Sequence, residues 1–435
     1  MSTLPGFPAR TALVAALLAA LPGAAHAAQI NYQVGVSALH SDNIGLSESG
    51  QQSDTVVSPQ LRFDIEQTGS TLRLNAQGQL QYLDYRDDTF DDGFRGAFTG
   101  QALWTMIPER LDWTFEDYLS RQPIDSFAAF SPGNEQQANL FVTGPSLYLR
   151  MGQTTRSQID LRYSNSYAEE NESFNSDRYN AAIRVLRDLS STRMISANLE
   201  ATRVVFDLAA LNADYTRYDG YGRYWSQFRS VELTVDLGYS RLEFNDRPAN
   251  DAWMPLVRGD LAWRVSPRST LDLALSYEFS DAAENLAFND TNTPIPNDFS
   301  DPAITVTPDV FKQRRAELGY SFAGERLGFE LRPYYQRISY VDSLAPDERS
   351  WGGFAQLSYK IRPLTTLSLA AAQEQRSFQD PSRRNRDFTA SLALEHQFTR
   401  HWSTRYELQR RERNSSEAGQ DYDENAAIVS FSYRR

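Results

Sequence analysis

Cysteine is absent from this chain of 435 residues. Without cysteine the protein has neither a disulfide framework nor thiolate chemistry. Long hydrophobic runs are also absent: from Ala28 onward no stretch of about 18 apolar residues occurs, which excludes a transmembrane helix in that part. A transmembrane β-barrel escapes this test, because only every second residue of its strands faces lipid.

Histidine is scarce, with four in the chain. The sequence His40-Ser41-Asp42 contains the residue types of a nucleophilic triad. Neighbouring residues of a strand point to opposite faces, so these three cannot form a relay among themselves. We therefore expect no catalytic residues, no cofactor and a protein that is not an enzyme.

The chain carries an excess of acidic residues, and its formal net charge is −13. A nucleic-acid partner is not expected, because phosphate binding requires a basic surface. The acidic clusters do not have the spacing of a known calcium loop. We expect no metal site in them, and interpret them as solvated loops near lipopolysaccharide: Asp87, Asp88, Asp91, Asp92, Glu169, Glu170 and Glu172.

The first residues have the organisation of an export signal. Arg10 precedes the apolar run Thr11–Leu21, Pro22 and Gly23 interrupt it, and Ala25-His26-Ala27 follows. A positive region, an apolar core and an A-x-A site are typical of a cleaved signal peptide. The prediction is a signal peptide over 1–27 and one mature domain over 28–435.

The stretch Leu261–Phe279 shows the pattern that dominates the chain. Apolar residues alternate with small or charged ones on both sides of the polar turn Ser266–Ser269. Side chains of a strand alternate between two faces, so this is a hairpin with one apolar and one polar face. A soluble sandwich would pair its apolar faces, whereas a transmembrane barrel turns them toward lipid.

The connections between alternating segments differ in length in a regular way. Turns such as Thr68–Ser70, Pro108–Arg110 and Thr399–His401 are short, and the connections between them are long and polar, such as His40–Ser53 and Ser280–Pro308. Outer-membrane barrels place short turns on the periplasmic side and long loops outside. We predict an all-β, antiparallel up-and-down barrel of about 18–20 strands in the outer membrane of a Gram-negative bacterium.

Two features disagree with this pattern. Four prolines lie in predicted strands, where a missing N–H interrupts the ladder. We expect Pro59 and Pro255 near strand ends. Pro145 and Pro333 are expected either at bulges or outside strands whose boundaries differ from the predicted ones. The region Asp207–Phe228 has weak alternation and leaves the strand count uncertain by two.

Charged residues between apolar neighbours are predicted to line the barrel lumen, since an arginine facing lipid at the bilayer midplane costs about 2–4 kcal/mol. These arginines either guide an anionic polymer or pair with carboxylates and stiffen the wall, and the sequence does not separate the two roles. The predicted lumen residues are Arg62, Arg73, Arg162, Arg184, Arg264, Glu278, Arg332 and Arg405.

One stretch near the start of the predicted barrel carries a family resemblance. It reads S-D-N-I-x-L at Ser41–Leu46, then S-D-x-V-x-x-x-P-x-L from Ser53, and its key residues are Ser41, Asp42, Asn43, Ile44, Leu46, Asp54 and Pro59. This pattern resembles the β-barrel porins linked to exopolysaccharide and PEP-CTERM gene systems of Gram-negative bacteria. From the residue types alone, Asp42 and Asn43 are expected to form hydrogen bonds within their loop.

The resemblance implies an outer-membrane pore or conduit for exopolysaccharide export. A general or small-solute porin and an anchoring barrel plugged by its own loops remain alternatives, with Ser280–Pro308 as the expected constriction. The implied partners are outer-membrane lipid, lipopolysaccharide, the barrel assembly machinery, a periplasmic export partner and an anionic polysaccharide.

Overall fold

The alternating segments form twenty long β-strands in the computed structural model, which describes residues 28–208, 214–245, 250–289, 306–341, 345–379 and 382–435. The predicted signal peptide, residues 1–27, lies outside these ranges. The strands are β1 Gln29–Ser41, β2 Asp54–Thr68, β3 Leu72–Tyr85, β4 Gly93–Ile107, β5 Leu111–Pro123, β6 Glu135–Arg150, β7 Thr155–Ala168, β8 Ser176–Ser190, β9 Arg193–Phe206, β10 Tyr215–Gln227, β11 Val231–Phe244, β12 Ala252–Ser266, β13 Ser269–Ser280, β14 Phe311–Ala323, β15 Leu327–Tyr340, β16 Glu348–Arg362, β17 Thr365–Phe378, β18 Arg383–Gln397, β19 Trp402–Ser415 and β20 Tyr422–Arg434. Helix α2 (Ala282–Asn289) follows β13, and 3-10 turns occur at Pro132–Asn134 and Glu172–Phe174.

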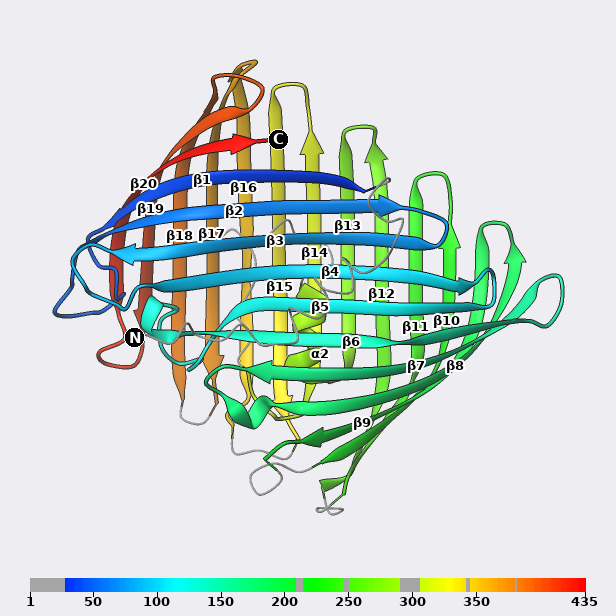
Figure 1. Ribbon diagram of the computed structural model, residues 1–435. Coiled ribbons are helices and arrows are strands. Elements are labelled where there is room, and N and C mark those ends of the chain that lie inside the picture. The colour runs from blue at the N-terminus through cyan, green and yellow to red at the C-terminus, as the bar shows by residue number, and fades with distance from the viewer. Residues whose placement is uncertain (1–27, 209–213, 246–249, 290–305, 342–344, 380–381) are drawn as a thin grey trace, which may run out of the picture.

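The strands form one closed antiparallel sheet in which each pairs with its neighbour in sequence (Figure 1). The barrel closes where β1 pairs with β20, from Gln33 opposite Arg434 to Ser41 opposite Ala426. Beyond that ladder, Tyr32 and Arg435 exchange two backbone hydrogen bonds of 3.0 and 2.9 Å. The prediction of an up-and-down barrel of 18–20 strands is confirmed.

Short and long connections gather at opposite ends of the barrel. In Figure 1 the tight turns lie along the upper right edge and the long connections along the lower left. The weakly patterned region holds β10, with a connection at 207–214 before it and a short turn at 228–230 after it. Part of each of five connections at this end lies outside the described residues, including 290–305 of the predicted constriction.

The outer surface of the barrel is apolar. Leu199, Tyr239 and Trp253 expose 68%, 65% and 64% of their surface, and many other large apolar side chains of the strands are exposed as well. Such a surface is favourable in hydrocarbon and unfavourable in water. Among the residues that the structure describes, no helix is both long and apolar enough to cross a membrane.

The predicted bulges at proline are wrong. Pro59, Pro145 and Pro333 lie inside strands, and at each the ladder to one neighbour is interrupted while the register stays unchanged on both sides. The side of each proline that lacks an N–H faces the interrupted ladder. The strand therefore accommodates the proline without the extra residue of a bulge. Pro255 lies near the start of β12, as expected, whereas Pro59 does not lie at a strand end.

Candidate functional site

The barrel encloses a cavity of about 1450 Å³, and each of the twenty strands contributes at least one lining residue. Six of the eight residues predicted to face the lumen line it: Arg62, Arg162, Arg184, Glu278, Arg332 and Arg405. Arg73 shares a strand face with Gln77, and Arg264 shares one with Arg258, but both lie beside short turns, outside the lining of this cavity. The predicted set is thus divided between the cavity and the short-turn mouth.

Most of these charges have a partner of opposite sign close by. Arg162 lies 3.5 Å from Asp160, which also pairs with Arg184. Arg332 lies 2.5 Å from Glu330 and 3.8 Å from Glu317.

Two further predicted residues follow the same arrangement. Arg405 lies 2.9 Å from Glu407, and the Glu278 carboxylate lies 2.5 Å from Arg258. Several pairs are two residues apart on one strand, and such residues point to the same face. The geometry therefore favours wall stiffening over an array of unpaired cations as the role of these arginines.

Helix α2 lies inside the barrel (Figure 1), where it contacts β5 and β6. Asp281, directly before the helix, accepts hydrogen bonds of 2.6 Å from Arg178 of β8 and from the Tyr215 hydroxyl of β10. Arg217 of β10 forms a two-point pair with Glu284, at 2.8 and 2.6 Å. We call these five residues the clamp of α2.

Apolar contacts support the clamp. Ala282, Ala283 and Leu286 of α2 are buried in one cluster with side chains of β5, β6 and β7, including Tyr118 and Leu140. Val306, where the described chain resumes, belongs to the same cluster. The helix thus narrows the lumen on the side of β5–β10 and leaves the remaining wall facing the cavity.

Burial affects the ionisation of the clamp acids. Burial raises the pKa of the Asp281 carboxyl, but the Arg178 guanidinium and the Tyr215 hydroxyl lower it more, so that the pKa falls to about 2. Burial raises the pKa of Glu284, against the effect of Arg217. Of the two clamp acids, Asp281 therefore remains ionised to the lower pH.

The clamp was missed in the sequence, although one signal for it was present. Asp281 and Glu284 have the D-x-x-E spacing of a capping box, and the Asp281 side chain accepts the Glu284 N–H at 3.0 Å. Asp281 thus caps the helix through one oxygen and binds Arg178 through the other. No sequence signal points to Arg178 or Arg217 as its partners.

A second connection crosses the long-loop mouth. Phe127, between β5 and β6, packs on Phe378 of β17 with ring centroids 4.6 Å apart. Its backbone carbonyl accepts hydrogen bonds from Arg383 of β18 and, at 3.5 Å, from Arg413 of β19. The segment 124–134, which follows β5, therefore crosses this mouth and contacts β17, β18 and β19.

The family-signature residues organise the same mouth. Asn43 is fully buried and bonds Ser47 at 2.8 Å, while Asp42 accepts from the side chain of Asn425 at 2.9 Å. The expected bonds within the loop are present for Asn43, whereas Asp42 reaches the last strand instead. Ser41 donates to Glu424 at 2.5 Å.

The other signature residues support the first two loops. Asp54, also fully buried, accepts from the backbone of Thr55 and Asp87 at 2.5 and 3.1 Å. Ile44 and Leu46 are buried, and Pro59 is exposed on β2. In the described part of the chain, no three acidic or histidine side chains gather where they could hold a metal ion.

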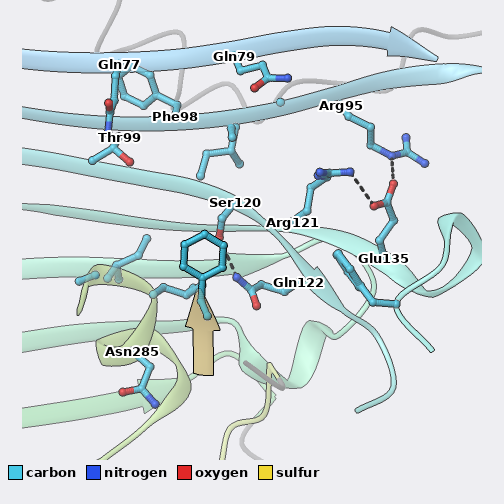
Figure 2. A pocket seen from close by; sticks show the side chains of 18 of the residues that line it. Gln77, Gln79, Arg95, Phe98, Thr99, Ser120, Arg121, Gln122, Glu135 and Asn285 are labelled. Carbon is cyan, nitrogen blue, oxygen red and sulfur yellow. Dashed lines mark hydrogen bonds and ion pairs between the residues drawn. The ribbon is translucent and has the colours of Figure 1, made fainter. Parts of the chain in front are cut away.

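The part of the cavity wall formed by β1–β3 is mostly uncharged. Figure 2 shows Gln77, Gln79 and Thr99 on one side of the cavity and Asn285 of α2 on the other. At the rim, Glu135 pairs with Arg95 at 2.6 Å and with Arg121 at 3.2 Å. The cavity is therefore mostly neutral along β1–β3, while ion pairs line much of the remaining wall.

A closed barrel with an apolar outer surface and a polar lumen is an outer-membrane β-barrel protein. The sequence matches no protein-family model and no curated protein. Among solved structures, the chain is similar to the siderophore receptor PirA from Pseudomonas aeruginosa, at 11% identity and a TM-score of 0.43 over 94% of this chain and 80% of that one. It is also similar to the FrpB iron transporter from Neisseria meningitidis, at 9% identity and a TM-score of 0.45 over 93% and 82%. These similarities assign no substrate to this chain.

Proposed function

We propose that this protein is a non-enzymatic conduit through which an exopolysaccharide crosses the outer membrane. The observation that carries the proposal is the cavity, whose wall presents many amides, hydroxyls and paired charges among apolar side chains. A hydroxyl-rich polymer exchanges hydrogen bonds with water for hydrogen bonds with such a wall at little net cost. The resemblance of Ser41–Leu46 to barrels of exopolysaccharide-linked gene systems supports the same function.

The segments inside the barrel argue against a permanently open small-solute porin. Helix α2 and segment 124–134 both cross space that an open porin leaves to water. They also suggest the second candidate, an anchoring barrel plugged by its own loops. The polar clamp favours a conduit that opens, because its ion pairs can be exchanged for water once the helix moves.

A clean deletion strain tests the proposal. We expect the strain to lose surface polysaccharide, to retain polymer in the periplasm, and to recover export when the intact gene is supplied. A periplasmic export partner would then copurify with the barrel. Normal surface polysaccharide in the deletion strain would contradict the proposal.

Electrical recordings separate the candidates from one another. We expect the purified protein to conduct weakly in planar bilayers and to conduct more when the clamp is removed. A large steady conductance of the intact protein would favour the small-solute porin. A closed state that persists without the clamp would favour the anchoring barrel.

A further inference from the structure

We propose that the lumen face of β2 and β3 is a binding track for an uncharged, hydroxyl-rich glycan. The track consists of Gln60, Gln77, Gln79 and Gln81, which we call the amide wall. This inference rests on the proposed function and names the class of polymer. The binding experiment below can succeed or fail independently of the export experiment.

The strand register brings the four amides together. Gln60 lies opposite Gln81, and Arg62, the next inward residue of β2, lies opposite Gln79. Gln77, Gln79 and Gln81 alternate along β3, so their side chains share one face. All four line the cavity and are half-buried. The result is a patch that spans two strands along the path through the barrel.

Most of the hydrogen-bonding capacity of the amide wall is unused. Gln79 donates to Gln81 at 3.1 Å. Among the described residues, the side chains of Gln60 and Gln77 form no hydrogen bond. A carboxamide has two donors and one acceptor oxygen, and a sugar hydroxyl is both donor and acceptor. The wall therefore offers both halves of the hydrogen bonds that a glycan needs.

The charges near the amide wall suit a polyanion less well than they suit a neutral polymer. Arg95, opposite Gln81, is already paired with Glu135 at 2.6 Å. Across the lumen, Arg223 lies 2.7 Å from Asp236, and Arg258 lies 2.5 Å from Glu278. A carboxylated polymer would have to break such pairs, whereas a neutral polymer leaves them intact. Arg62, opposite Gln79, is the other cation beside the amide wall, and the experiment includes it.

The position of α2 leaves this wall accessible. The helix packs on β5 and β6 and is clamped to β8 and β10. Asn285 of the helix lines the same cavity as Gln77 and Gln79, and Figure 2 shows it well apart from both of them. A chain entering the lumen therefore meets the amide wall on one side and the helix on the other.

Calorimetry on the full-length barrel in detergent tests the proposal. The probes are maltohexaose, cellohexaose and a hexagalacturonate, and the variant combines Gln60→Ala, Gln77→Ala and Gln81→Ala. We expect at least one neutral hexasaccharide to bind, and its affinity to fall about tenfold or more in the variant. Heat-modifiable migration on a gel verifies that the variant folds.

Two control variants make the result specific. Gln158→Ala removes a lumen-facing amide that already donates to Asp160 at 2.9 Å, and should leave binding unchanged. Arg62→Gln should leave neutral binding unchanged as well.

Three results would overturn the proposal: no binding of either neutral sugar, equal binding by the triple variant, or tighter binding of hexagalacturonate that is lost in Arg62→Gln. If the deletion strain exports normally while neutral sugars bind, the proposed export function fails and the binding track stands.

Discussion

The side-chain amide of Asn43 donates a hydrogen bond of 2.9 Å to the backbone carbonyl of Asp423, 380 residues further along the chain. The contact joins the first loop to the last strand, beside the seam where β1 closes on β20. Asn43 also bonds Ser47, so one buried side chain shapes the loop and ties it to the other end of the barrel. The signature sequence thus has a structural role at closure.

Replacing Asn43 by alanine should weaken the barrel at this seam. The substitution removes a fully buried side-chain amide and leaves the carbonyls of Ser47 and Asp423 without their donor, which costs about 1–3 kcal/mol. Denaturant titration in lipid vesicles would measure the lower free energy of unfolding. Asn31→Ala, on the strand β1 that precedes this loop, removes an exposed bond to Asp64 and should change that free energy by less than about 0.5 kcal/mol. Equal losses in both variants would contradict the role of Asn43.

Replacing Arg178 by alanine should release helix α2. Asp281 would remain buried with its charge unpaired, and breaking a buried pair in this way costs about 3–5 kcal/mol. Single-channel recordings should show a larger conductance than the intact protein. Arg156→Ala, which removes an exposed pair with Asp188 at 2.8 Å, should leave the conductance unchanged. An unchanged conductance in Arg178→Ala would mean that the clamp does not hold the helix.

Acidification should release the helix in a defined pH range. The pKa of Asp281 is lowered from 3.8 to about 2, so its charge stabilises the clamp above about pH 4 and this contribution is lost as the pH falls toward 2. Glu284 has the opposite shift, a raised pKa, so its protonation occurs first and does not by itself remove stability. Conductance measured against pH should rise in that range. Asp281→Asn should lack the transition, and a transition that persists there would exclude Asp281 as its cause.

The outer surface can be tested with a charge. Leu199, near the middle of β9 and 68% exposed, should face hydrocarbon, so Leu199→Arg should destabilise the barrel in vesicles by about 2–4 kcal/mol. Glu200→Arg places the same side chain in the wet lumen and should cost much less. Denaturant titration of both variants would compare them, and similar losses would contradict the assignment of the two faces.

The barrel could be predicted because its signal is local. Alternation such as that of Leu271, Leu273 and Leu275 appears in the strand itself, and the difference between short and long connections needs no tertiary contact. The alternation is weak at strand β10 because its outward face has no aliphatic residue and includes Tyr218, Gly220 and Gly222. A face without aliphatic residues produces little alternation.

The site could be predicted in part. Arg332 and Arg405 were found from their inward positions, and their acids two residues away were visible in the sequence. The clamp was not found, because its members Arg178 and Asp281 are separated by 103 residues and meet through strand register and a helix inside the lumen.

The sequence alone determined a polar-and-apolar alternation, and with it a closed sheet whose apolar side chains face outward, since side-chain direction along a strand follows from backbone geometry. The tertiary structure decided which residues meet across the lumen. Closure of β1 on β20 turns the row of hairpins into a ring, and only that ring places the clamp and the four glutamines on different parts of one cavity wall.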